Sequence, residues 1–161
     1  MNIRRATSAD LPIILTLIRD LAEYEMELDR VEATEESLAA TMFSDNPRVF
    51  CELAEDQGET VGLAIWFFNY STWQSKYGIY LEDLFVKPHA RGRGHGLALL
   101  KHLAALCVEN GGGRFAWSVL DWNQPAIDFY TQLGAVPLSE WVGYRVSGPA
   151  LDALAALKTS R

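Results

Sequence analysis

The stretch that decides the fold is YLEDLFVKPHARGRGHGLALL, which runs from Tyr80 to Leu100. It begins as an apolar strand, yet two adjacent carboxylates, Glu82 and Asp83, stand within that strand. The chain then passes through Pro88 into a turn with three glycines and two arginines, and it leaves the turn as a leucine-rich helix. A strand, a glycine turn and a helix in this order predict an anion site a few residues from a pair of carboxylates.

The glycine turn has the chemistry of a phosphate site. The first amides of a helix have no partners within the helix and point outward, and the helix dipole adds positive charge there. Glycine lets a phosphate approach the backbone, and Arg91 and Arg93 can add charge-assisted hydrogen bonds. A plain tight turn with solvated arginines is the alternative. The Walker lysine is missing, and glycines at positions one, three and five differ from the dinucleotide pattern of one, three and six.

Length and composition are those of a globular protein, and we predict a single domain over residues 1–161. The net charge of −7 argues against nucleic acid or an anionic membrane as the main partner and favours cations. Apolar runs are too short to span a bilayer, and the start, MNIRRATSAD, lacks the apolar core of a secretory signal. Two scattered cysteines, Cys51 and Cys107, allow one disulfide, but without a secretory leader they indicate reduced thiols in a cytoplasmic protein.

Hydrophobic periodicity predicts an α/β fold with a mixed sheet and helices on its faces. A crossover helix joins the strand that ends at Val86 to the next strand, so these two strands should be parallel, whereas the strands before them form a meander. We expect strands at 2–7, 48–56, 59–70, 77–86, 114–120 and 143–148, and helices at 8–25, 34–43, 97–110, 123–133 and 149–157. Thr34 and Asn123 should cap the second and fourth of these helices, and Gly134 follows the end of the fourth. The packed face of helix 97–110 should carry Leu97, Leu100, Ala104, Cys107 and Val108.

The glycine turn resembles the pyrophosphate turn of the GCN5-related N-acetyltransferase (GNAT) superfamily, Arg/Gln-x-x-Gly-x-Gly/Ala, with Arg91, Gly94 and Gly96 in its fixed places. The expected order β-α-α-β-β-β-α-β-α-β, in a mixed and mostly antiparallel sheet, is similar to the GNAT acyltransferase fold. LIRDLAEYE, IYLEDLFVKP and VLDWNQPAIDFYTQLGA resemble the spermidine/spermine (diamine) acetyltransferase branch, and YSTW and VLDWNQ resemble its members that acetylate thialysine. The resemblance covers Ile3 to Leu138.

This resemblance implies that acetyl-CoA is the cosubstrate. Backbone groups of the strand would meet the pantetheine arm, the glycine turn would cradle the pyrophosphate, and the following helix would add contacts. The residues implied are Leu84, Phe85, Val86, Arg91, Gly92, Arg93, Gly94, His95, Gly96, Asn123 and Tyr130. No metal is expected, because the histidines lack zinc-site spacing, and we interpret His89, His95 and His102 as surface or turn residues.

Amine acetylation poses two proton problems. An amine with a pKa of about 10 must lose a proton before it attacks, and the CoA thiolate leaves more readily when it is protonated. The resemblance implies Tyr130 as the general acid, Glu82 as a carboxylate near the amine, and Tyr24 and Glu25 as a pair that contacts the amine. Side chains alternate along a strand, so Glu82 and Asp83 should face opposite sides, and we favour Glu82 as the one that faces the substrate. Asp83 either adds charge to the substrate site or forms a structural hydrogen bond.

We therefore expect an N-acetyltransferase that acts on a primary amine of a small diamine, a polyamine or a lysine-like amino acid such as thialysine. No cysteine–histidine pattern is present, which favours direct attack in a ternary complex. The string SEWVGYRV has lost one of two acids found in polyamine enzymes, since Val142 stands before Gly143, and this disfavours spermidine. The alternatives are a protein, peptide or aminoglycoside amine, or a non-catalytic acyl-CoA-binding regulator.

A dense set of aromatic residues surrounds the third strand of the meander. Core packing is its default use, and an apolar wall for the substrate chain or a subunit interface are the functional alternatives. Because the resembled family is dimeric, we expect a homodimer to which this set contributes. The set comprises Trp66, Phe67, Phe68, Tyr70, Trp73, Tyr77 and Tyr80.

Overall fold

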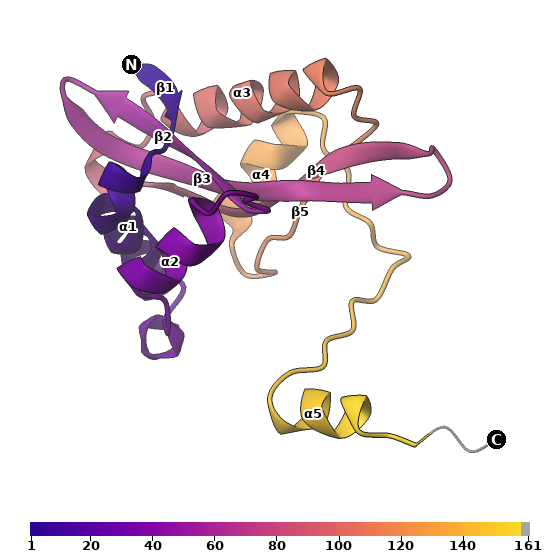
Figure 1. The fold of residues 1–161 in the computed structure, drawn as a ribbon. Coiled ribbons are helices and arrows are strands. Elements are labelled where there is room, and N and C mark those ends of the chain that lie inside the picture. Colours follow the sequence, from indigo (N-terminus) through magenta and orange to yellow (C-terminus); the bar gives the residue numbers. More distant parts are fainter. Residues whose placement is uncertain (159–161) are drawn as a thin grey trace. The chain divides into compact units, whose positions relative to one another are not determined.

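The computed structural model describes residues 1–158, which form two compact units divided after Ser118. The first unit is a five-stranded sheet with α1 and α2 on one face and α3 on the other (Figure 1). The single domain over 1–161 stays a prediction, and its last three residues lie outside the described ones. The elements of the first unit are β1 (Asn2–Arg5), α1 (Leu11–Tyr24), α2 (Glu35–Met42), β2 (Phe50–Asp56), β3 (Glu59–Ser71), β4 (Lys76–Val86), α3 (His95–Glu109) and β5 (Phe115–Trp117), with short 3-10 turns at Ser8–Asp10, Leu28–Arg30 and Pro88–Ala90.

The strands lie in the order β1-β2-β3-β4-β5. The first four are antiparallel to their neighbours, whereas β5 runs parallel to β4 with Ile79 opposite Phe115 and Leu81 opposite Trp117. The predicted mixed, mostly antiparallel sheet and its parallel pair are therefore confirmed. The glycine turn directly follows the end of β4 and leads into α3, so these three features lie next to one another.

Helices α1 and α2 cover one face of the sheet with a hydrophobic core. Ile14 and Leu17 of α1 are fully buried against Leu53 and Leu63 of the sheet. The N-terminus of α2 is fixed as predicted, because the Thr34 hydroxyl accepts a hydrogen bond from the amide of the third helical residue at 3.1 Å. Both cysteines are free and buried. Burial raises the pKa of the Cys51 thiol to about 12.

The opposite face packs on α3, and here two predictions fail. Leu100 and Cys107 are buried as expected, but Leu97, Ala104 and Val108 are exposed, and the packed row is completed by Leu99 and Leu103. The helix is apolar on several sides, so the periodicity left its inward face ambiguous. The interpretation of His95 as a surface or turn residue is wrong: it is 2% exposed, because the first turn of α3 directs it inward toward Asp56.

The second unit contains α4 (Gln124–Gln132) and α5 (Pro149–Ala155). Asn123 caps α4 as predicted, accepting from the Ala126 amide at 3.4 Å, and Gly134 ends it with a φ of 85°. The strand predicted at 143–148 is wrong, since these residues are extended or irregular and exposed. A strand requires a neighbour for its backbone hydrogen bonds, and residues 119–158 of this unit contain none. Among residues 1–158, no helix combines the length and the hydropathy needed to cross a bilayer.

Candidate active site

The two carboxylates of β4 lie at an irregularity in the sheet. β3 and β4 pair regularly as far as Ile65 opposite Asp83, and the register then shifts so that Trp66 pairs with Leu81. Glu82 is the extra residue, as in a β-bulge. The regular alternation assumed from the sequence is therefore wrong at this point, and it cannot assign the two carboxylates to opposite faces. That Glu82 is the one facing the substrate stays a prediction.

Asp83 is partly buried on the side of the sheet that α1 covers. It pairs with Ile65, a member of the core beneath α1 and α2, and paired residues of adjacent strands share a face. Burial raises the pKa of Asp83 to about 6, and the negative charges of Glu82 and Glu25 add to the rise. Glu25 directly follows α1, and burial together with the charge of Glu27 raises its pKa as well. Three carboxylates therefore interact here, in a setting that favours a cationic ligand.

Beyond these carboxylates, one side of β4 has no strand partner within the described residues. Within residues 1–158 the ladder between β4 and β5 extends only from Ile79 to Leu81, whereas β4 continues to Val86. Strand residues alternate the direction of their backbone hydrogen-bonding groups, so some groups of Leu84–Val86 point away from β3 toward this edge. An extended ligand arm could bond to them in the manner of an added strand.

The glycine turn has the backbone geometry that its sequence predicts. Gly92 and Gly94 have φ values of 73° and 87°, in the left-handed region that favours glycine, and Gly94 directly precedes α3. A Cβ atom added at either glycine would meet no other heavy atom within 4 Å, so open space lies beside the backbone. The fifteen-residue helix α3 then presents its first amides and the positive end of its dipole. These features fit an anionic group such as a pyrophosphate.

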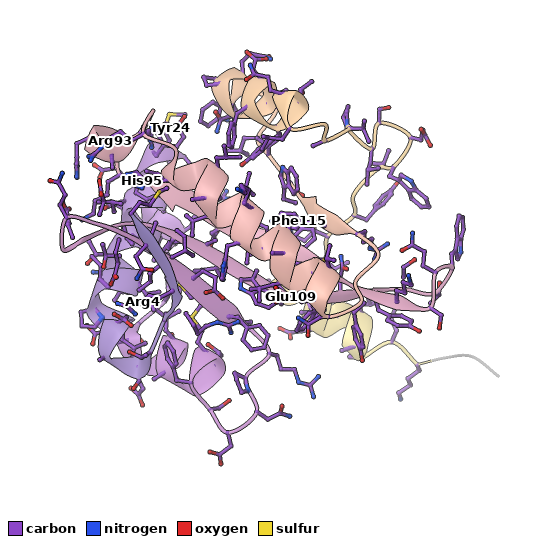
Figure 2. All side chains as sticks on the ribbon, turned by 90° about the horizontal axis from the view of Figure 1, so that it is seen from above. Arg4, Tyr24, Arg93, His95, Glu109 and Phe115 are labelled. Carbon is purple, nitrogen blue, oxygen red and sulfur yellow. The ribbon has the colours of Figure 1, made fainter. Side chains whose placement is uncertain are left out.

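The two arginines of the turn are held differently. The Arg91 guanidinium lies 4.7 Å from the ring centre of Tyr24 and 5.5 Å from that of Phe85, and its Nε donates to the Val86 carbonyl at 2.9 Å. Arg93 forms an ion pair with Asp56, the last residue of β2. In Figure 2, Arg93 and His95 mark the N-terminal end of α3, and Glu109 marks its other end.

Beside the turn lies a pocket of about 420 Å³ between the C-terminal half of α1 and the segment that follows β4. Its lining combines acidic and basic side chains with the aromatic rings of Tyr24 and Phe85. Lys87 in one wall is already paired with Glu59 at 2.8 Å. The lining residues are Asp20, Glu23, Tyr24, Phe85, Lys87, Pro88, His89 and Arg91. The structure thus brings Tyr24 and Arg91 together, although the sequence analysis assigned them to different ligands.

Two predicted site residues belong to the second unit. Asn123 is the cap of α4, and Tyr130 lies within that helix, next to Phe129 with a ring-centre distance of 5.5 Å. Burial raises the pKa of the Tyr130 phenol, which keeps it protonated and able to donate over the whole neutral range. Their roles stay predictions. Within residues 1–158, no group of three or more histidine, cysteine or acidic side chains is arranged to hold a metal ion.

Comparison with known proteins decides the family. The sequence model described as "Acetyltransferase (GNAT) family" matches residues 14–135, which is most of the chain and includes β4, the glycine turn and α4. The chain belongs to the GNAT family. It is therefore an N-acetyltransferase, and the mixed sheet described above is that of the GNAT fold.

Named relatives lie within the same family. The chain is 42% identical to a thialysine N-epsilon-acetyltransferase of Sus scrofa, over 95% of this chain and 96% of that protein. It is 38% identical to the spermidine/spermine N(1)-acetyltransferase-like protein 1 of Homo sapiens, over 90% of this chain and 22% of that longer protein. Among solved structures, an integron cassette protein from the mobile metagenome of V. cholerae superposes with a TM-score of 0.82 at 28% identity, over 97% of this chain and 98% of that one.

Sequence reasoning about this GNAT chain missed Asp56, which contacts both Arg93 and His95. Its only signal was its position before the Gln57-Gly58 turn, where an aspartate is ordinary turn chemistry. It also missed that Tyr24 contacts Arg91, because residues so distant in sequence show no pattern that reveals a contact.

Proposed function

We propose that the protein transfers the acetyl group of acetyl-CoA to a primary amine of a small diamine, a polyamine or a lysine-like amino acid such as thialysine. The observation that carries this proposal is the group of carboxylates at the β4 bulge, where Asp83 is partly buried beside Glu82 and Glu25. Such a group attracts an ammonium ion, because neighbouring carboxylates repel one another and a positive charge between them relieves this repulsion. The names of the relatives at 38–42% identity support the same substrate class.

For the cosubstrate, we propose that the side of β4 without a strand partner meets the pantetheine arm and that the glycine turn holds the pyrophosphate. The left-handed glycines and the open space beside them support the second assignment. Charge-assisted hydrogen bonds from the turn arginines would add to the backbone amides. The proposed residues are Leu84, Phe85, Val86, Arg91, Gly92, Arg93, Gly94, His95, Gly96, Asn123 and Tyr130.

We assign the proton transfers to two residues. Glu82 would accept a proton from the substrate ammonium, directly or through a water, and so free the amine to attack the thioester carbonyl carbon. A C–N bond forms and the C–S bond breaks, and Tyr130 would donate its proton to the departing thiolate. The nitrogen would then lose its second proton to solvent, and Tyr130 would regain a proton from solvent. The raised pKa of Tyr130 supports a phenol that is protonated when it is needed. Direct transfer in a ternary complex also agrees with the burial and raised pKa of Cys51, which make it a poor nucleophile.

Within the substrate class, we favour a short diamine or an amino-acid side chain over spermidine. Val142 occupies a position where polyamine enzymes usually carry an acid, so the contact that would hold a distal ammonium is reduced to Glu140. The thialysine enzymes named above at 42% identity support this preference. Structural neighbours that are aminoglycoside acetyltransferases are only 18–22% identical and share the fold alone.

We also propose that the protein is a cytoplasmic homodimer. The two free cysteines support a reducing compartment. Large apolar side chains at the tip of the β3–β4 hairpin and in the C-terminal segment are exposed, as expected of surfaces that are covered in an assembly. They include Tyr70, Trp73, Tyr77, Trp141 and Tyr144. Trp66, from the same aromatic set, is buried in the core instead.

A thiol-release assay tests the proposal. Acetyl-CoA is offered with a panel of diamines, polyamines, lysine analogues, short peptides and aminoglycosides, and the release of free CoA is followed. We expect release that requires an amine and is fastest with a small diamine or a lysine-like amino acid. Tight binding of acetyl-CoA without transfer to any amine, or a clear preference for peptides or aminoglycosides, would contradict it.

A further inference from the structure

Arg91 of the glycine turn is held by two aromatic rings and one backbone carbonyl. Its guanidinium lies over the rings of Tyr24 and Phe85, and its Nε–H donates to Val86. A cation over an aromatic face is attracted by the ring quadrupole, and the planar guanidinium can also stack. These contacts fix the position and the plane of a long side chain that otherwise samples many rotamers.

The rings of Phe85 and Tyr24 differ in how deeply they are buried. Phe85 is 4% exposed and belongs to the core beneath α1 and α2, so packing alone explains it. Tyr24 is 39% exposed at the last position of α1, outside that buried core. Figure 2 shows Tyr24 toward the N-terminal end of α3, where His95 begins the helix. The contact between Tyr24 and Arg91 thus connects the end of α1 to the glycine turn.

We propose that Tyr24 is a positioning residue for acetyl-CoA, which acts by orienting Arg91 toward the pyrophosphate. The inference rests on the proposed function, in which the glycine turn binds acetyl-CoA, whereas the family resemblance implied only an amine contact for Tyr24. An arginine that is already held in place loses less freedom when a phosphate binds, so the ring of Tyr24 strengthens cofactor binding without touching the cofactor. Tyr24 therefore serves both ligands of the reaction.

The test is calorimetric titration of acetyl-CoA, without any amine, into the wild type, Tyr24→Leu and Tyr24→Phe. Leucine is a strong helix former at an exposed helix end, so the first variant should fold. Loss of the ring should weaken acetyl-CoA binding by about two- to tenfold, the range expected when one long side chain must be ordered on binding. Phenylalanine keeps the ring and should restore most of the affinity. Equal affinity of Tyr24→Leu and the wild type overturns the inference.

A double-mutant cycle with Arg91→Met shows whether Tyr24 acts through Arg91. Arg91→Met alone should weaken acetyl-CoA binding, and adding Tyr24→Leu to it should cause no further loss, because the arginine that the ring orients is gone. A further loss of the same size as in the wild-type background contradicts the positioning role. The proposed function and the inference about Tyr24 can be refuted independently of each other. A wild type that does not bind acetyl-CoA refutes the proposed function, whereas binding that is insensitive to Tyr24→Leu refutes only this inference.

Discussion

Replacement of Asp83 by asparagine should stabilise the protein at neutral pH while it weakens amine binding. Burial and the charges of Glu82 and Glu25 raise the pKa of Asp83 from its ordinary 3.8 to about 6, so the folded state disfavours the charged form. The full rise corresponds to about 3 kcal/mol, because each factor of ten in proton affinity is 1.36 kcal/mol. Solvent screening of a partly buried group reduces this, and we expect a gain of about 1–2 kcal/mol at pH 7.5.

The raised pKa of Asp83 also fixes how the stability gain should change with pH. An acid whose pKa is raised in the folded state binds its proton more tightly there than in the unfolded chain, so stability rises as the pH falls from about 7 toward 4. The gain from Asp83→Asn should therefore be largest above pH 7, shrink as the pH falls through about 6, and disappear only below the ordinary pKa of 3.8. Urea unfolding of both proteins across this range measures it. Asp45→Asn, at an exposed position between α2 and β2, is the matched control and should change little.

The same variant should raise the KM for the amine in the thiol-release assay, because a negative charge is lost from the substrate site. A variant that is more stable but binds substrate less well is the behaviour expected of a charge kept for function. An Asp83→Asn protein that is less stable than the wild type at pH 7.5, with a difference that does not vary with pH, would refute the reasoning about this site.

Three further predictions follow from other parts of the structure. Tyr130→Phe should lower kcat by about 100-fold, the scale of general acid catalysis, but weaken acetyl-CoA binding only slightly in calorimetry, because the ring is kept; unchanged turnover would remove Tyr130 from the chemistry. Gly94→Ala should raise the KM for acetyl-CoA but not for the amine, since a Cβ would project from a left-handed residue into the space beside the turn. Asp10→Asn should cost about 1–3 kcal/mol in urea unfolding at pH 7, because two hydrogen bonds from Arg4 at 2.7 and 2.8 Å hold the pKa of Asp10 well below its usual range. This difference in unfolding free energy should shrink below pH 4, because Asp10 of the wild type then takes up a proton and loses its ion pair with Arg4. A difference that stays the same size at low pH would contradict the prediction.

Local sequence signals predicted the elements whose causes are local. The Thr34 and Asn123 caps, the glycine turn and the parallel β4–β5 pair depend on neighbouring residues or on a short crossover, and all are confirmed. The bulge at Glu82 could not be predicted in this way, because it depends on how β3 pairs with β4. Period-two alternation carries no information about where one extra residue enters a strand.

The remaining misses have tertiary causes as well. The inward face of α3 is ambiguous because leucines occur on several of its sides, and the burial of His95 depends on the position of Asp56 at the end of a distant strand. The predicted strand at 143–148 has the composition of a strand but no neighbour within the second unit. In the candidate site, the residue types were identified from the sequence, whereas the contact between Tyr24 and Arg91 was visible only in the structure.

The most direct test of the account is identification of the reaction product. Purified protein is incubated with acetyl-CoA and thialysine, and the amine is examined by mass spectrometry with fragmentation to locate the added group. The account predicts one acetyl group on the side-chain amine, formed in step with release of free CoA and strongly reduced in Tyr130→Phe. Release of CoA without acetylated amine, or an acetyl group found on the protein but on no small amine in the panel, would contradict it.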